Sequence, residues 1–119
     1  FPTNFELIPM GEGFTWNTKD KERDTLVAGR TWDLCKEKIL SGKYKIVVLD
    51  EINIALRYNY LDVHDVTDFL KEKPEDLHVI LTGRNAPPEI IEIADMVTEM
   101  KEIKHPYKSG VKAQKGIEY

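Results

Sequence analysis

Two adjacent carboxylates close the most apolar run of this 119-residue chain. Residues Lys45 to Leu49, KIVVL, are too few for a helix and rich in β-branched side chains, so they predict a strand buried on both faces of a parallel sheet. Asp50 and Glu51 follow at once. Because function in open α/β sheets gathers at the carboxyl ends of strands, and Mg²⁺ takes one or two carboxylates beside water and phosphate oxygens, the pair predicts a magnesium site.

The next predicted strand, His78 to Leu81, ends in polar residues as well. Thr82, Gly83 and Arg84 follow it, so two neighbouring strands present carboxylate, hydroxyl and guanidinium groups at one rim. This arrangement is typical of a Walker B strand beside a bound nucleotide. Simpler interpretations remain open from the local pattern alone: the carboxylates cap the following helix and interact with its dipole, and the arginine braces a surface loop.

A Walker B strand normally works beside a phosphate-binding loop of the form G-x-x-x-x-G-K-[ST]. The sequence does not contain that loop. Gly42-Lys43 is followed by Tyr44 and lies at a predicted helix end, and Lys112 and Lys115 have no glycine-rich cradle before them. Because the chain starts with FPTNFELIPMG and no initiator Met, we expect it to be the later part of a longer protein whose preceding portion holds the first strand and this loop.

A second unusual segment is GEGFTWNT, residues 11–18. It places Phe14 and Trp16 on a glycine-containing loop just after a predicted strand. Two aromatic rings in such a loop can close over a flat ligand and exclude water from a reacting centre. The alternative is a hydrophobic anchor that ties the loop to the core.

Helices and strands are predicted to alternate along the whole chain. Periodicity, caps and prolines predict, in order, a short strand at 5–9, a helix at 20–40, the strand at 45–49, a short helix at 52–56, a helix between Asp62 and Pro74, the strand at 78–81, a short helix beginning at Pro87 and Pro88, an edge strand at 96–103 and a short strand at 116–119. The spacing of Ala28, Trp32, Cys35 and Ile39 predicts one apolar face on the helix at 20–40, and Asp62 is the predicted cap of the helix that follows it. This order predicts an α/β fold with an open, mainly parallel sheet and helices on both faces, and we expect residues 1–119 to be the C-terminal part of a single domain.

Composition limits the classes of partner. The net charge is −4 and the Lys and Arg residues are scattered among acidic neighbours, so a nucleic acid is not an expected partner. The single Cys35 falls on an apolar helical face, which excludes a disulfide framework and favours a reducing compartment. No apolar run approaches the ~18 residues of a membrane span. We therefore expect a cytoplasmic protein that binds neither nucleic acid nor membranes.

Five segments together resemble a known family. GFTW, VVLDE, LTGRNAP, ADMVTEM and the tail KHPYKSGVKAQKGIEY, in this order and spacing, are similar to the ATP:corrinoid adenosyltransferases of the cobalamin pathway, also called cob(I)yrinic acid a,c-diamide adenosyltransferases. The resemblance covers nearly the whole chain, and TGRNAP and the tail are its most specific parts. It implies a RecA-like P-loop fold, a homodimer, and transfer of the 5′-deoxyadenosyl group of ATP to Co(I) of a reduced corrinoid, with release of triphosphate. A reductant protein is a further implied partner.

The resemblance also implies roles for particular residues. Phe14 and Trp16 match an aromatic loop that helps to displace the lower axial ligand of cobalt, which makes its reduction easier. Glu51 matches a direct Mg²⁺ ligand and a catalytic residue, while Asp50 matches a ligand that acts through water. The residues implied at the nucleotide are Arg84, Asn85, Lys112 and Gln114.

The missing glycine-rich loop separates this sequence from the family pattern. Without it we expect the 119-residue chain alone to bind ATP weakly and to turn over slowly or not at all, whereas a full-length parent is active. Two other functions remain open. A RecA-like ATPase would use Glu51 to activate water and release orthophosphate, and a non-catalytic module would bind a corrinoid or a nucleotide without adenosyl transfer.

Overall fold

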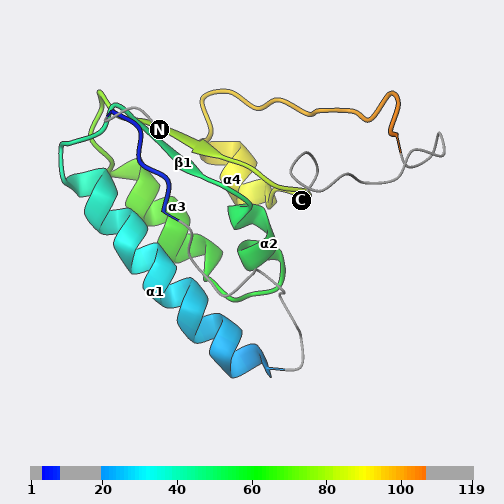
Figure 1. Ribbon diagram of the computed structural model, residues 1–119, viewed down its shortest axis with the longest axis horizontal. Coiled ribbons are helices and arrows are strands. Elements are labelled where there is room, and N and C mark those ends of the chain that lie inside the picture. Colours follow the sequence, from blue (N-terminus) through cyan, green and yellow to red (C-terminus); the bar gives the residue numbers. More distant parts are fainter. Residues whose placement is uncertain (1–3, 9–19, 107–119) are drawn as a thin grey trace.

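The computed structural model describes residues 4–8 and 20–106 (Figure 1). Within them the elements are α1 (Lys21–Leu40), β1 (Ile46–Leu49), α2 (Ile52–Arg57), α3 (Val63–Lys71), β2 (His78–Leu81) and α4 (Pro88–Ile93). All four predicted helices in this range and the two central strands are confirmed. The predicted strand at 116–119 lies outside the described residues.

The two strands form a parallel pair, as the alternation of strands and helices predicts. Ile46 pairs with His78 and Leu49 pairs with Leu81, so the strands are in register over their whole length. The chain crosses from the end of β1 to the start of β2 through α2 and α3. The α/β class is confirmed, with a two-stranded parallel sheet in the described part of the chain.

Capping side chains set where the two longer helices begin. The Asp20 carboxylate accepts a hydrogen bond from the Arg23 amide at 3.1 Å at the start of α1. Asp62 does the same for α3, where its Oδ1 accepts from the His64 amide at 2.7 Å. Both bonds satisfy amides that have no partner within their helix. The predicted cap at Asp62 is confirmed.

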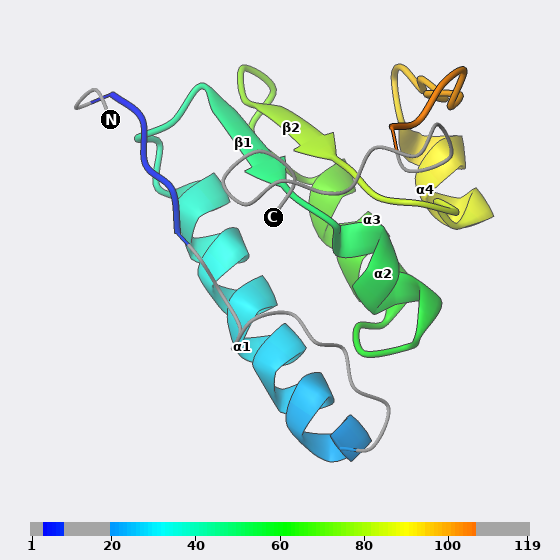
Figure 2. The same cartoon turned by 45° about the vertical axis from the view of Figure 1, so that its right-hand side comes forward.

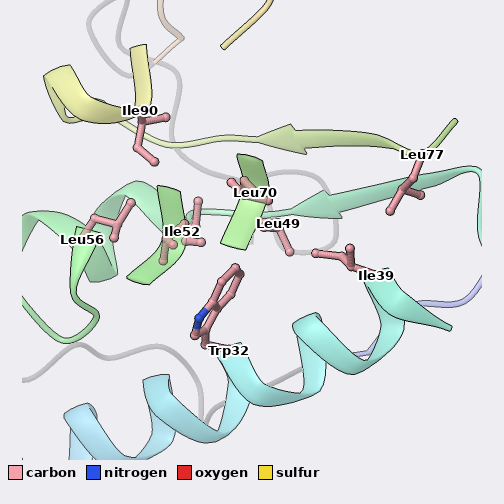
Figure 3. Close-up of a cluster of buried hydrophobic side chains, with 9 residues drawn as sticks. Trp32, Ile39, Leu49, Ile52, Leu56, Leu70, Leu77 and Ile90 are labelled. Atoms are coloured by element: carbon pink, nitrogen blue, oxygen red, sulfur yellow. The ribbon is translucent and has the colours of Figure 1, made fainter. Parts of the chain in front are cut away.

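The core lies between the sheet and the helices α1 and α3. In Figure 3, Trp32 and Ile39 of α1 point toward Leu49 of β1. Trp32 also meets the Phe69 ring of α3 edge to face, with ring centroids 5.4 Å apart. The buried cluster consists of Trp32, Ile39, Leu49, Ile52, Leu56, Val66, Leu70, Leu77 and Ile90. The predicted apolar face of α1 is therefore confirmed.

Cys35 lies on that same face of α1 and packs against the core. Its burial raises the pKa of the thiol. At neutral pH the thiol therefore stays protonated, which fits the packing role expected from its position.

Only one face of the sheet is covered in the described part of the chain. Val47 and Val79 pack against the core, but the side chains that alternate with them lie on the opposite face. There, Ile46 is 57% exposed, Val48 54% and Ile80 47%. We call these three residues the open sheet face. The prediction of strands buried on both faces, with helices on both sides, is wrong for the described residues, because α1 and α3 both contribute to the core on the same side (Figure 2).

The predicted strand at 96–103 is also wrong. After α4 the chain runs on without lying beside β1 or β2, as the orange segment of Figures 1 and 2 shows. Met96 is 84% exposed and Met100 92%. An alternating pattern makes a strand only where a neighbouring strand offers hydrogen bonds, and no described strand does so here.

The first predicted strand, at 5–9, is absent from its described part, residues 5–8. Glu6 instead holds this segment near the end of α1, where its carboxylate lies 3.4 Å from Lys38 Nζ and accepts a hydrogen bond from the Tyr44 hydroxyl. The bond from Tyr44 lowers the pKa of the Glu6 carboxyl. Side-chain contacts, rather than strand pairing, place these residues.

Within the described ranges, no helix is long and apolar enough to cross a membrane.

Candidate functional site

Acidic and hydroxyl side chains meet where the two strands end. Leu49 and Leu81 are paired, so Asp50 and Thr82, the next residues on each strand, lie beside each other. The Thr82 hydroxyl donates to Asp50 Oδ1 at 2.8 Å and accepts a hydrogen bond from the Glu51 amide at 2.9 Å. The structure thus brings together Asp50, Thr82 and the backbone of Glu51 at this end of the sheet.

Glu51 adopts a left-handed backbone conformation, with φ 61° and ψ 22°. It precedes α2, but its side chain makes no capping hydrogen bond to that helix. The interpretation of Glu51 as a side-chain helix cap is therefore wrong. Its carboxylate is exposed and makes no hydrogen bond or ion pair within the described part of the chain, so it is available to a ligand.

Asn53 ties α2 to the loop that follows β2. The residue is 3% exposed, and its Nδ2 donates to the Gly83 carbonyl at 3.0 Å. Its backbone amide donates to the Thr82 carbonyl at 3.4 Å. The side-chain oxygen of Asn53 is buried without a partner among the described residues. Sequence reasoning missed this residue, although a lone amide in the apolar stretch INIAL was a signal.

Gly83 allows this close approach. Its φ is +126°, and a Cβ placed on it would lie 2.9 Å from the Cβ of Asn53. Such a distance is shorter than real Cβ contacts, and the backbone conformation is one that L side chains rarely adopt. The loop after β2 therefore needs glycine at this position.

We expect Gly83→Ala to lower the free energy of unfolding by about 1–3 kcal/mol, because the new methyl group must move Asn53 or the loop. Gly29→Ala is the matched control, since Gly29 lies inside α1 and a methyl group added there would meet no described atom within 4 Å beyond its own stretch of helix. That change should stabilise the protein by about 0.5–1 kcal/mol. Urea denaturation of both variants measures the difference, and equal midpoints would contradict the role assigned to Gly83.

Comparison with known proteins decides the family. The family model described as ATP:corrinoid adenosyltransferase BtuR/CobO/CobP matches residues 1–119. The chain belongs to this family. A corrinoid adenosyltransferase of Sinorhizobium sp is 57% identical over 115 residues, which is 96% of this chain and 54% of that protein. Those of Pseudomonas aeruginosa and Escherichia coli are 44% and 38% identical, over 100% and 99% of this chain and 59% and 60% of their own lengths.

This chain thus spans between half and two thirds of the length of the corrinoid adenosyltransferases it matches. The resemblance inferred from GFTW, VVLDE, TGRNAP and the tail is confirmed. The family match includes the strand ends where Asp50, Glu51 and Thr82 meet.

Six further residues have roles implied by the resemblance. Two of them lie on the loop after β2, and four lie outside the described residues. Arg84 and Asn85 are exposed on the loop after β2, one and two residues beyond Gly83. Arg84 forms no ion pair with the described residues, so its guanidinium is not used to brace them. The others, Phe14, Trp16, Lys112 and Gln114, lie outside the described residues.

The donor set at the strand ends suits a magnesium ion that keeps most of its waters. Asp50 and Glu51 supply carboxylate oxygens, the hard ligands that Mg²⁺ prefers, and Mg²⁺ is commonly held by only one or two of them. Among residues 4–8 and 20–106, no group of three or more His, Cys, Asp or Glu side chains is placed to hold a metal ion.

Proposed function

We propose that this chain forms the magnesium-holding and corrinoid-facing part of an ATP:corrinoid adenosyltransferase, which transfers the 5′-deoxyadenosyl group of ATP to a reduced corrinoid. The observation that carries the proposal is the exposed pair Asp50 and Glu51 at the end of β1, coupled to the next strand by Thr82. The family match and the corrinoid adenosyltransferases among its relatives support it.

The chemistry sets two requirements. Co(I) attacks C5′ of ATP, the cobalt–carbon bond forms, and the C5′–oxygen bond breaks with its electron pair going to triphosphate. Co(I) is already a strong nucleophile, so the protein has to expose it rather than activate it. Bound Mg²⁺ supplies neutralising charge for the triphosphate leaving group.

The described residues are proposed to stabilise the triphosphate leaving group by holding the metal and the nucleotide. Glu51 is proposed as the direct ligand of the metal, because its carboxylate has no partner in the described structure. Asp50 already accepts a hydrogen bond from Thr82, which suits a ligand that acts through water. Arg84 and Asn85, exposed on the neighbouring loop, are proposed as nucleotide contacts, together with Lys112 and Gln114.

The exposure of Co(I) is assigned to the aromatic loop. We place Phe14 and Trp16 against the corrin ring, where they exclude water and favour loss of the lower axial ligand. The wider assignments follow the family: a RecA-like P-loop domain, a homodimer in the cytoplasm, and a reductant protein that supplies the electron. The parallel strands with functional groups at their carboxyl ends are compatible with that fold.

The test uses the full-length gene product that contains this sequence. Incubation with ATP, Mg²⁺ and a chemically reduced corrinoid should give an adenosylated corrinoid and one equivalent of triphosphate. Release of orthophosphate without a cobalt–carbon bond would show a RecA-like ATPase instead. Corrinoid binding without either product would show a non-catalytic module.

A separate titration tests the importance of the phosphate-binding loop. When Mg-ATP is added to the 119-residue chain in a calorimeter, we expect binding too weak to saturate at micromolar concentrations, because the sequence has no glycine-rich loop to bind the phosphates. The full-length gene product is the control. Micromolar binding by the 119-residue chain would contradict this prediction.

A further inference from the structure

We infer that Thr82 is a positioning residue, whose hydroxyl holds the Asp50 carboxylate and the Glu51 backbone at the end of β1 in the arrangement that binds the metal. The inference rests on the proposed function and adds a residue to it. Thr82 acts through Asp50 and Glu51 and is not itself assigned a contact with substrate.

The direction of both hydrogen bonds at Thr82 is fixed by chemistry. The Glu51 amide only donates, and it lies 2.9 Å from Thr82 Oγ1. An ionised carboxylate only accepts, and Asp50 Oδ1 lies 2.8 Å from the same oxygen. The single hydroxyl proton must therefore point to Asp50. Thr82 uses one donor and one acceptor to connect both members of the pair.

Each bond has a distinct effect. The bond to Asp50 is charge-assisted, and it fixes the orientation of that carboxylate. The bond from the Glu51 amide supports a left-handed backbone at a residue with a side chain, a conformation that persists only when its surroundings enforce it. Removing the hydroxyl therefore frees the Asp50 carboxylate and takes away the support of the backbone that carries Glu51.

The position of Thr82 is itself fixed by the backbone around it. Its amide donates to the Leu49 carbonyl at 3.3 Å, which extends the pairing of β1 and β2 by one residue. Its carbonyl accepts from the Asn53 amide at 3.4 Å, and Asn53 also binds the Gly83 carbonyl. Thr82 is thus held by the sheet on one side and by α2 on the other, so its hydroxyl is preorganised.

The test compares Thr82→Val, which keeps the shape and removes the hydroxyl, with Thr82→Ser, which keeps the hydroxyl. In the full-length gene product we expect Thr82→Val to raise the Mg²⁺ concentration for half-maximal activity about 10–100-fold, the usual effect of losing a residue that orients a metal ligand. Thr82→Ser should need a Mg²⁺ concentration close to that of the wild type, because it keeps the hydroxyl. Thr31→Val is the matched control, because the Thr31 hydroxyl donates to the Val27 carbonyl within α1 and has no other bond among the described residues. It should leave the Mg²⁺ dependence unchanged.

Two results would overturn the inference. One is an unchanged Mg²⁺ dependence in Thr82→Val, and the other is a Thr82→Ser variant as defective as Thr82→Val. If Thr82 had only a structural role, Thr82→Val would shift the urea midpoint, as the loss of any partly buried hydroxyl such as that of Thr31 can, and the Mg²⁺ dependence of activity would stay as in the wild type.

Amide hydrogen exchange of the wild-type protein gives a readout that needs neither activity nor a variant. Glu51 is exposed, so its amide is protected from exchange only if it is bonded to Thr82. We expect this amide to exchange at least about 10-fold more slowly than an unprotected amide. Free exchange would overturn the inference even if adenosyl transfer is found. Protection of the amide, with Mg²⁺-dependent shifts at Glu51, would support it even if the reaction proves to be ATP hydrolysis.

Discussion

Glu51→Gln is expected to lower kcat for adenosyl transfer by about 100-fold or more, the range found when one preorganised electrostatic contact to a reacting centre is removed. The amide has nearly the same shape as the carboxylate but carries no charge, so it is a poor ligand for a hard cation. The Glu51 side chain makes no contact that the described fold depends on, and its backbone is held by Thr82 through the amide. The fold should therefore be retained.

The measurement is the rate of adenosylated corrinoid formation by the full-length gene product over a range of Mg²⁺ concentrations. We expect the loss to be larger at low Mg²⁺, since the metal is then the limiting component. Glu92→Gln is the matched control, because Glu92 is also exposed and lies on α4, outside the strand ends. If both variants keep the wild-type rate at limiting Mg²⁺, Glu51 does not hold the metal.

Ile39→Ala should lower the free energy of unfolding by about 2–5 kcal/mol, through lost burial and the cavity left behind. Ile39 is 1% exposed and belongs to the cluster between α1 and the sheet (Figure 3). Its side chain points toward Leu49, one residue before the acidic pair. A loss of this size is a large part of the ~5–15 kcal/mol that stabilises a typical domain.

The neighbouring residue supplies the control. Leu40 has the same number of side-chain carbons but is 61% exposed at the end of α1. Leu40→Ala is expected to change stability by less than about 0.5 kcal/mol. Urea denaturation of the full-length gene product compares the two variants. A shift in midpoint that is equal for both would mean that the helix does not pack as described.

Local sequence signals predicted the helices well. The capping residue Asp62 and the spacing of Ala28, Trp32 and Ile39 depend on interactions within one helix, or on the single apolar face it buries. Both are visible in a short window of sequence. Sheet environment is different, because a strand such as KIVVL is equally apolar whether one or two of its faces are covered. Whether Val48 is buried depends on which other segments pack there.

Part of the site was predictable for a related reason. Polar residues that directly follow paired parallel strands must lie together, so the meeting of Asp50 and Thr82 follows from the strand pattern. The left-handed backbone of Glu51 could not be predicted from the strand pattern, because it is supported by the Thr82 hydroxyl, 31 residues later in the chain. Asn53 was missed for the same reason, since its partner Gly83 becomes visible only once α2 packs on the loop.

The open sheet face has a consequence for handling the isolated polypeptide. Ile46, Val48 and Ile80 form a water-exposed apolar surface on a sheet whose outer strand edges have no partner strand within the described residues. Exposed strand edges and apolar patches are where separate copies adhere to one another. As the concentration of the 119-residue chain rises, clustering of molecules, rather than loss of helices, is expected to limit the amount that stays in solution.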